Sequence, residues 1–267
     1  MTVSELYRFL EQRVPKSLSC EWDNDGLMCC PDPEREVRRV LLVLDITEDM
    51  TEVAIKEHCD VIVSHHPLVF RPVKALTTEA GVPRKLIKLV KNGIAAMSFH
   101  TRLDAVRGGV NDVLAELLGL QGVESFGPEG EAMGRVGTVA SPCDVDEFAA
   151  RVKKILNAPA VLVSGKGRVS RVAVLGGNGA DFIGAAIAAG ADTFVSGRLG
   201  YHPMTDAPEA GIKLIEAGHY FTERPVLSVL SSMIEEADGN IETVMRESNQ
   251  FAVSSKQRLK NKNRPQG

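Results

Sequence analysis

Two adjacent histidines, His65 and His66, directly follow the apolar residues 61–63 and Ser64. The β-branched residues predict a buried strand, and Pro67 predicts a loop after it. Neighbouring side chains of an extended segment point in opposite directions, so the two imidazoles cannot easily share one ligand. They can instead serve two metal ions, one each. The alternative is a strand end with one packed histidine and one solvated histidine.

Two further histidines each follow an apolar stretch and precede a carboxylate by four residues, in His100-x-x-x-Asp104 and His219-x-x-x-Glu223. Mixed imidazole and carboxylate ligands suit Zn, Fe, Mn or Co, whereas all-oxygen sets suit Mg or Ca. A pair of ions roughly 3.5 to 4 Å apart needs a bridging group, and Asp104 and Glu223 are the candidates. We therefore predict two divalent transition-metal ions per chain, whose remaining positive charge favours hydroxide or an anionic substrate.

The elements that position these residues alternate between strand and helix. Residues 39–44 predict a buried strand, and residues 47–58 predict an amphipathic helix with Thr47 as its N-cap. The strand that ends at His65 completes a βαβ unit, and residues 94–99 predict the next strand. Because ligand sites of α/β sheets form at the carboxyl ends of the strands, the histidines are expected to meet there.

The second half of the chain repeats the first. Residues 39–66 align without a gap with residues 171–198, and eight positions are identical, including Arg39 with Arg171 and Asp60 with Asp192. The strand-helix-strand order also matches, which predicts two related α/β lobes from an internal pseudo-repeat. Where the first copy has Ser64-His65-His66, the second has Ser196-Gly197-Arg198, so the paired imidazoles belong to one lobe only.

The predicted division of the chain follows from this repeat. We expect a first α/β lobe at residues 1–120 and a second at residues 169–247. Between them, residues 121–168 predict a small inserted β-α-β module. Residues 248–267 carry five basic residues after Asn249 and no acid, which predicts a disordered, solvated tail. Gly176-Gly177-Asn178-Gly179 predicts a tight turn, because it lacks the lysine and hydroxyl residue of a phosphate loop.

Composition excludes several classes of function. The 267 residues carry a net charge of −4, which gives no general attraction to nucleic acid or anionic membranes. Residues 1–14 predict an amphipathic helix and not a signal peptide, since they lack a basic start and an uninterrupted apolar run. The five cysteines are an odd number without zinc-knuckle spacing, which favours free thiols in a reducing cytoplasm.

Five blocks of the chain resemble, in order and spacing, the signature blocks of the NIF3-like family, also called GTP cyclohydrolase 1 type 2. They are Trp22-Asp23-Asn24-Asp25-Gly26-Leu27, Ser64-His65-His66-Pro67, Phe99-His100-Thr101-Arg102-Leu103-Asp104 with Gly109-Val110-Asn111-Asp112, Gly134-Arg135-Val136-Gly137, and Ala217-Gly218-His219-Tyr220-Phe221-Thr222-Glu223. Two positions depart from the family pattern, because Arg198 replaces an aspartate and Asp25 replaces an aliphatic residue.

The resemblance implies two related α/β lobes, a homohexameric ring and a dinuclear metal centre facing its cavity. The ligands that it implies are His65, His66, Asp104, His219 and Glu223, with His100 as a neighbour. It also implies a metal-dependent hydrolase in which a metal-bound hydroxide attacks a nucleotide ring or a similar small molecule. Arg135 and Arg198 are candidates to contact a substrate phosphate.

Two alternatives to this hydrolase remain. One is a non-catalytic, metal-binding ring protein that acts through a protein partner, as described for some members of the family. The other is a dinuclear phosphoesterase or amidohydrolase that acts on another small molecule.

Overall fold

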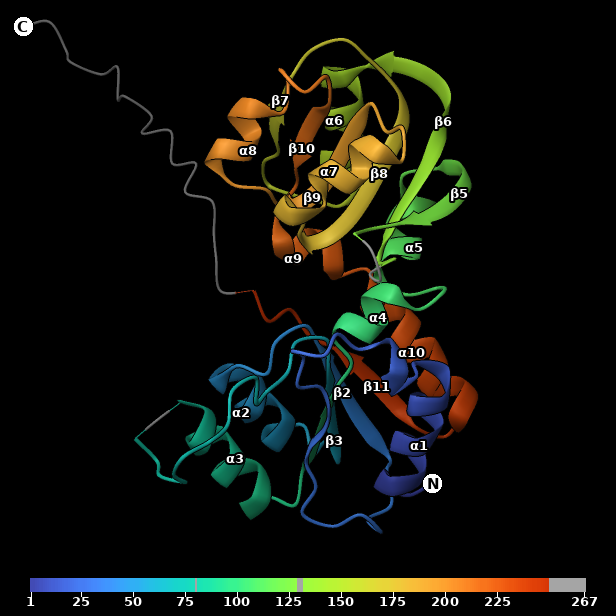
Figure 1. Ribbon diagram of the computed structural model, residues 1–267. Coiled ribbons are helices and arrows are strands. Elements are labelled where there is room, and N and C mark those ends of the chain that lie inside the picture. The colour runs from blue at the N-terminus through green and yellow to red at the C-terminus, as the bar shows by residue number, and fades with distance from the viewer. Residues whose placement is uncertain (80, 129–131, 250–267) are drawn as a thin grey trace, which may run out of the picture.

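The computed structural model describes residues 1–79, 81–128 and 132–249. These residues form two α/β lobes, each built on one sheet (Figure 1). The first sheet has the strand order β1-β4-β3-β2-β11, and the second has the order β5-β6-β8-β9-β10-β7. The predicted two-lobed α/β fold is therefore confirmed.

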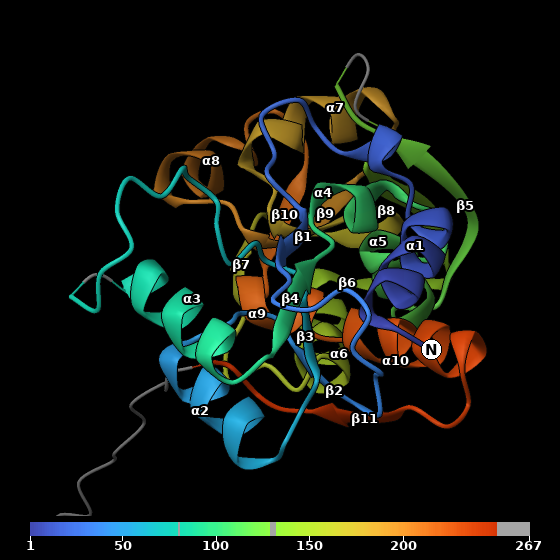
Figure 2. The same cartoon turned by 90° about the horizontal axis from the view of Figure 1, so that it is seen from below.

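Helices cover both faces of the first sheet. The strands are β1 (Gly26–Cys29), β2 (Arg39–Val43), β3 (Val61–Ser64), β4 (Ala95–Ser98) and β11 (Glu242–Met245). Its helices are α1 (Val3–Arg13), α2 (Glu48–Lys56), α3 (Gly81–Lys91) and α10 (Val226–Ala237). Figures 1 and 2 show α1 and α10 on one side of the sheet and α2 and α3 on the other.

The apolar residues of β2 explain this double covering. Val40 and Leu42 belong to the core beneath α1 and α10, whereas Leu41 and Val43 belong to the core beneath α2 and α3. Successive side chains of a strand point to opposite faces, so an unbroken apolar run is what a central parallel strand requires. Thr47 begins α2 as predicted, because its side chain accepts a hydrogen bond from Met50 N.

The second sheet is built from the second copy of the repeat and from the segment before it. The copy supplies the parallel strands β8 (Arg168–Asn178), β9 (Thr193–Arg198) and β10 (Lys213–Glu216). The preceding segment supplies β5 (Leu120–Phe126), β6 (Gly134–Asp144) and β7 (Leu162–Ser164). The helices of this lobe are α5 (Val110–Leu117), α6 (Val145–Ile155), α7 (Ile183–Ala188) and α8 (Tyr201–Asp206).

The segment predicted as an inserted module is thus part of the second sheet. β6 pairs with β8 and extends one side, whereas β7 pairs with β10 on the other side. The sequence repeat could not show this, because β6 and β7 join the sheet through antiparallel pairing with β8 and β10 of the second copy.

The chain also returns to the first lobe at its end. α10 packs against α1 in the first core, and β11 pairs in parallel with β2. The division expected from the sequence, with residues 169–247 in the second lobe, differs from this arrangement. The pairing joins segments about 200 residues apart, which no local pattern in the sequence specifies. Residues 250–267 of the predicted tail lie outside the described residues.

The repeat is visible in matched hydrogen bonds. The Asp60 carboxylate accepts from the backbone N–H groups of Arg38 and Arg39, and the Asp192 carboxylate accepts from those of Ser170 and Arg171. These aspartates tie the start of one strand to the start of the next in each lobe. The identity of Asp60 with Asp192 in the alignment therefore has a structural cause.

No helix among the described residues is long and apolar enough to cross a bilayer.

Candidate metal centre

Two short helices carry three of the predicted ligands to the junction between the lobes. These are α4 (Thr101–Ala105), which follows β4, and α9 (His219–Glu223), which follows β10 (Figure 1). α4 holds Asp104, whereas α9 holds both His219 and Glu223. His65 and His66 arrive from the end of β3. The five predicted ligands therefore converge from both lobes, although their binding of metal stays a prediction.

Their side-chain atoms fall into overlapping groups. One group contains His65, Asp104 and Glu223, and another contains His66, His219 and Glu223; within each, one ligand atom per residue lies within 4.8 Å of the others. A third group joins His65 and His66 to His100, the residue predicted as a neighbour. Glu223 is shared by the first two groups, which suits a bridging carboxylate, whereas Asp104 belongs to one of them only.

Glu223 lies between imidazoles of the two lobes. Its Oε1 is 3.1 Å from His219 Nε2 and 3.7 Å from His65 Nε2. Its Oε2 is 3.1 Å from His66 Nε2. Asp104 Oδ1 also lies 3.7 Å from His65 Nε2.

Three buried polar atoms test whether a cation fits here. His65 Nε2 and Asp104 Oδ1 have no hydrogen-bond partner among the described residues, and Glu223 Oε2 has only the ion-pair contact with His66 Nε2. A buried polar atom without a partner is costly, and these three side chains form one of the candidate groups. A divalent cation bound by this nitrogen and these oxygens would satisfy them together, so the donor set fits a metal such as Zn or Fe.

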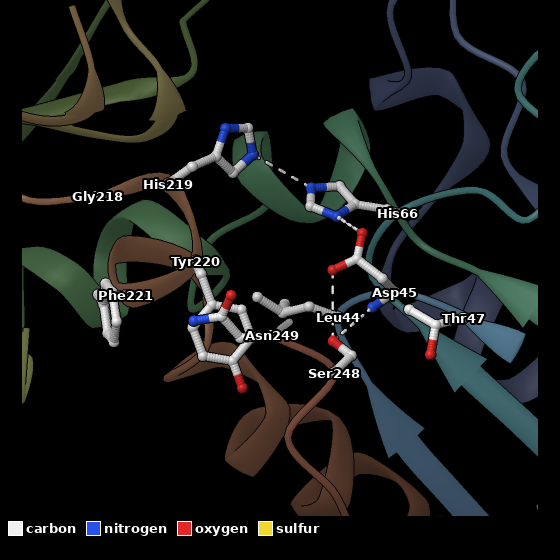
Figure 3. A pocket seen from close by; sticks show the side chains of 10 residues that line it. All are labelled: Leu44, Asp45, Thr47, His66, Gly218, His219, Tyr220, Phe221, Ser248 and Asn249. Carbon is white, nitrogen blue, oxygen red and sulfur yellow. Dashed lines mark hydrogen bonds and ion pairs between the residues drawn. The ribbon is translucent and has the colours of Figure 1, made fainter. Parts of the chain in front are cut away.

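The imidazoles of His65 and His66 are oriented by hydrogen bonds at Nδ1, the ring nitrogen that does not face Glu223. His65 Nδ1 lies 2.9 Å from the Phe99 carbonyl oxygen, and His66 Nδ1 lies 2.8 Å from Asp45 Oδ1. Such partners fix the tautomer and turn Nε2 toward a metal. Ser248 in turn holds Asp45, because the Ser248 hydroxyl accepts from Asp45 N and donates to Asp45 Oδ2 (Figure 3).

His100 is fixed in the same way by the loop that contains Trp22. Its Nδ1 lies 2.8 Å from Asp23 Oδ1, while Asp23 Oδ2 accepts from both the backbone and the hydroxyl of Thr101. Burial tends to raise the pKa of Asp23, but the hydrogen bonds from His100 and Thr101 outweigh it and lower the pKa to about 2. The carboxylate is therefore ionised at neutral pH.

The electrostatics of the cluster favour added positive charge. Burial and the nearby Glu223 charge raise the pKa of Asp104 to about 7. Burial acts to lower the pKa of His66, but Asp45 and Glu223 outweigh it and raise the pKa to about 10. Despite its burial, the pKa of Glu223 is held well below its usual range by His219, His65 and His66. Protons and metal ions compete for such atoms, so a cluster that attracts protons also suits dications.

Glycines make room for α9 on the second lobe. A Cβ atom at Gly177 would lie 2.3 Å from Glu223 Oε1, and one at Gly197 would lie 2.6 Å from Thr222 Oγ1. Gly176 to Asn178 belong to the end of β8. The glycine-rich motif, predicted as a tight turn, therefore allows the metal-site carboxylate to approach the backbone closely.

Asp25, which departs from the family pattern, has a buried partner. Its Oδ2 accepts a 2.8 Å hydrogen bond from Nε of Arg102, a fully buried residue, and another from His100 N. Lys16 and Ser19 hold its Oδ1. Asp25 therefore forms an ion pair with Arg102 and anchors the start of α4.

Arg135 is occupied by the protein and does not offer a free cation to substrate. It is 6% exposed, and its guanidinium makes a two-pronged contact with Asp112 and donates to carbonyls that include Ala105 O and Met133 O. The predicted phosphate contact is therefore replaced by a structural role, because these acceptors already use its donors. Arg198 is exposed at the end of β9, and its role stays a prediction.

Three cavities surround the cluster. One of about 450 Å³ is lined by Trp22, His100, Asp104, His219 and Glu223. A second, of about 500 Å³, lies beside His66 and His219 and is drawn in Figure 3. A third, of about 530 Å³, lies beside His66 and is lined by Phe70, Arg71 and Lys85.

Four residues near His66 were not predicted from the sequence, namely the orienting residues Asp45 and Ser248 and the two cations Arg71 and Lys85. Asp45 directly follows an apolar strand, as the histidines do, so its position in the sequence could have identified it as a candidate site residue. Ser248, Arg71 and Lys85 lie in no motif. Only the packing of distant segments brings them to His66.

The chain is similar to known proteins over most of its length. The model of the Duf34/NIF3 (NGG1p interacting factor 3) family matches residues 1–250. A Clostridium perfringens protein called GTP cyclohydrolase 1 type 2 homolog is 33% identical over 252 residues, covering 92% of this chain and 96% of its own. The Protein NIF3 homolog of Schizosaccharomyces pombe is 33% identical over 240 residues, covering 84% of this chain and 85% of its own.

Solved structures show the same fold. A Bacillus cereus protein related to NIF3 matches with a TM-score of 0.87 and 25% identity, covering 95% of this chain and 99% of its own. Reduced HcgD from Methanocaldococcus jannaschii matches with a TM-score of 0.80 and 30% identity, covering 92% of this chain and 97% of its own.

Proposed function

Because the chain belongs to the Duf34/NIF3 family, we propose that it is a dinuclear, metal-dependent hydrolase resembling GTP cyclohydrolase 1 type 2. Two divalent ions, Zn, Fe, Mn or Co, would be held at the junction of the lobes. The observation that carries this proposal is that two buried atoms, His65 Nε2 and Asp104 Oδ1, have no partner among the described residues and lie in one ligand group with Glu223.

The two ligand groups assign a role to each residue. His65 and Asp104 would hold one ion, His66 and His219 the other, and Glu223 both. Ions held there would act as Lewis acids and lower the pKa of water toward neutrality.

The chain's own residues would bind and orient the substrate. Arg71 and Lys85 line the cavity beside His66, where they can attract an anionic group such as a phosphate. Asp23 holds His100 through Nδ1, so that Nε2 remains to give or take a proton in the cavity shared with Asp104 and Glu223. The substrate would be a small molecule carrying a nucleotide ring or a similar group, and not a nucleic acid or a membrane lipid.

Two measurements test the proposal. Metal analysis of protein purified without chelator should find about two transition-metal ions per chain. A turnover screen with GTP, other nucleotides and cyclic amides should find a substrate whose hydrolysis Asp104→Ala abolishes. Absence of metal would refute the site, whereas turnover that is unchanged in Asp104→Ala would place the activity elsewhere. The screen also separates a cyclohydrolase from a phosphoesterase or amidohydrolase by the bond that is cleaved.

The alternative function is a metal-binding protein that acts through a protein partner. The family description, which names an interacting factor, favours it. Under this alternative, metal is bound but the turnover screen is negative. Affinity capture would then compare the wild type and Glu223→Gln as baits, and the partner should be recovered with the wild type and not with the variant.

Assembly and location are part of the same proposal. We expect a homohexamer in the cytoplasm, with the metal centres facing the inside of a ring. Sedimentation analysis should give a mass about six times that of the chain, and a monomer would contradict this expectation.

A further inference from the structure

Two large aromatic side chains are exposed beside the metal centre. Trp22 is 60% exposed and Phe70 is 46% exposed, although apolar side chains of this size usually bury much of their surface. Their ring centroids lie 6.2 Å apart, and the ring of His100 lies 6.2 Å from Trp22 and 6.4 Å from Phe70. We call Trp22, Phe70 and His100 the aromatic cluster.

The aromatic cluster is held in place from both sides. Trp22 is followed by Asp23, whose carboxylate is hydrogen-bonded to His100 and Thr101. The next residue, Asn24, donates a hydrogen bond from its amide to the Val69 carbonyl. That hydrogen bond joins the loop of Trp22 to the loop of Phe70. Two loops that are far apart in sequence are therefore fixed together, so the exposure of the two rings is not a consequence of unattached loops.

The aromatic cluster adjoins the ligand groups directly. The ring of His100 lies 5.3 Å from that of His65 and 5.6 Å from that of His66. Trp22 shares the cavity of about 450 Å³ with Asp104 and Glu223. A molecule that contacts the indole in this cavity is therefore also placed at the carboxylates.

The other walls of this cavity favour a flat group. Met133, Leu175 and Phe182 supply apolar surface, while Asn178 and Asp181 supply hydrogen-bonding groups. Apolar walls with a few polar groups are typical of small-molecule sites. Stacking on an aromatic side chain is available to any planar ring, because each has a π-face. A flexible aliphatic chain would bury apolar surface against the indole but could not stack on it.

We propose that Trp22 and Phe70 form a ring-binding subsite, which selects substrates carrying a planar heteroaromatic group and positions that group against the metal ligands. The inference rests on the proposed function in one respect only, that the bound ring is the part of the substrate presented to the metal centre. It adds the residues that recognise the substrate and the chemical class of the recognised group.

The tryptophan content of the chain provides a direct test. Trp22 is the only tryptophan, so fluorescence excited selectively at tryptophan, and not at the three tyrosines, reports on this subsite alone. The probe is guanosine 5′-monophosphate, titrated into the full-length wild-type protein with correction for absorbance. Ribose 5-phosphate, which keeps the sugar and phosphate but lacks the ring, is the matched ligand control. Saturable quenching by the nucleotide and none by the sugar phosphate is expected.

Calorimetry extends the test to variants that lack the fluorophore. Trp22→Ala should weaken nucleotide binding about 10-fold, and Trp22→Phe should restore most of it. Phe70→Ala should have a smaller effect in the same direction. Tyr201→Ala, which removes an aromatic side chain that is 79% exposed on α8, is the control and should bind as the wild type does.

The outcomes separate this inference from the proposed function. Absence of quenching, or equal affinity of Trp22→Ala and wild type, overturns the subsite even when two metal ions are present. A change of oligomeric state in Trp22→Ala with unchanged affinity also overturns it, because the indole would then belong to an interface. If the nucleotide quenches the fluorescence of a protein that holds no metal, the quenching supports the subsite, whereas the absence of metal refutes only the proposed hydrolase.

Discussion

The two lobes share a scaffold but contribute to the candidate metal centre in different ways. In the first lobe His65 and His66 directly follow the strand β3, whereas in the second lobe Gly197 and Arg198 are the last residues of β9. A Cβ atom at Gly197 would lie 2.7 Å from the Cα atom of His219. The helix that carries the second lobe's ligands thus occupies the space into which a side chain at the strand end would project.

The difference shows how a duplicated fold builds an asymmetric site. The first lobe supplies imidazoles whose Nδ1 atoms are bound to Phe99 O or Asp45. The second lobe supplies Glu223, which reaches both ligand groups, and His219, whose side chain is 45% exposed. We therefore regard the first lobe as the rigid half of the candidate centre and α9 as the element that would join the two proposed ions.

The largest expected effect is a difference in metal content between variants of Glu223 and of Asp104. Glu223→Gln should reduce metal content from about two ions per chain to near zero, because Glu223 is the residue common to both groups. Asp104→Asn should leave about one ion, since Asp104 belongs to one group. Metal analysis by mass spectrometry measures both. Equal losses in the two variants would break the proposed asymmetry.

A substitution at the end of β9 tests the space that α9 requires. Gly197→Ala should lower the free energy of unfolding by about 1 to 3 kcal/mol, because the new methyl group would clash with α9 and β8. The control is Gly184→Ala in α7, where the new methyl group would meet no other element within 4 Å and alanine favours the helix. Denaturant unfolding compares the two. A neutral Gly197→Ala would mean that α9 does not exclude the side chain.

Removing an orienting group tests the rigidity of the first lobe. Asp45→Asn should weaken metal binding 10- to 100-fold, the usual effect of losing the carboxylate that holds a ligating histidine. Ser248→Ala should have a smaller effect, since Ser248 acts through Asp45. Competition with a chromogenic chelator measures the affinity. Unchanged affinity in Asp45→Asn would show that His66 is positioned by its backbone alone.

The smallest effects concern the shared scaffold. Asp60→Asn and Asp192→Asn should each destabilise the fold by about 1 kcal/mol without changing metal content, because both carboxylates accept from two backbone N–H groups. Thermal unfolding and metal analysis measure the two quantities. Loss of metal in either variant would show that scaffold and site are not separable.

The Asp60 variant also has an expected pH dependence. Burial opposes ionisation of Asp60, but hydrogen bonds from Arg38 N and Arg35 outweigh it and lower its pKa. A carboxylate whose pKa is lower in the folded state stabilises the protein above its unfolded pKa of about 3.9, and that stability is lost as the pH falls through the folded pKa. Asp60→Asn should therefore unfold with less dependence on pH in the acid range.

The sequence predicted local features of the molecule well. The strand before His65, the capped helix at Thr47 and the repeat at Asp60 and Asp192 all depend on neighbouring residues, and the structure contains each of them. The sequence also predicted that the candidate ligands lie close together, because parallel strands bring their carboxyl ends to one edge of a sheet.

Features that depend on distant contacts were not predictable. The pairing of β11 with β2 and the approach of Ser248 to Asp45 each join segments about 200 residues apart. Arg135 was assigned to substrate because of its type, but its neighbours Asp112 and Ala105 decide its role. Charge and motif identify which residues can do chemistry, whereas packing determines which of their atoms remain available.

The central claim is that both lobes jointly hold two metal ions around Glu223. Anomalous X-ray diffraction from crystals of protein purified without chelator tests it most directly. The account predicts two peaks roughly 3.5 to 4 Å apart, one beside His65 and Asp104 and the other beside His66 and His219. A single peak that lacks contact with Glu223, or no peak among these side chains, would contradict it.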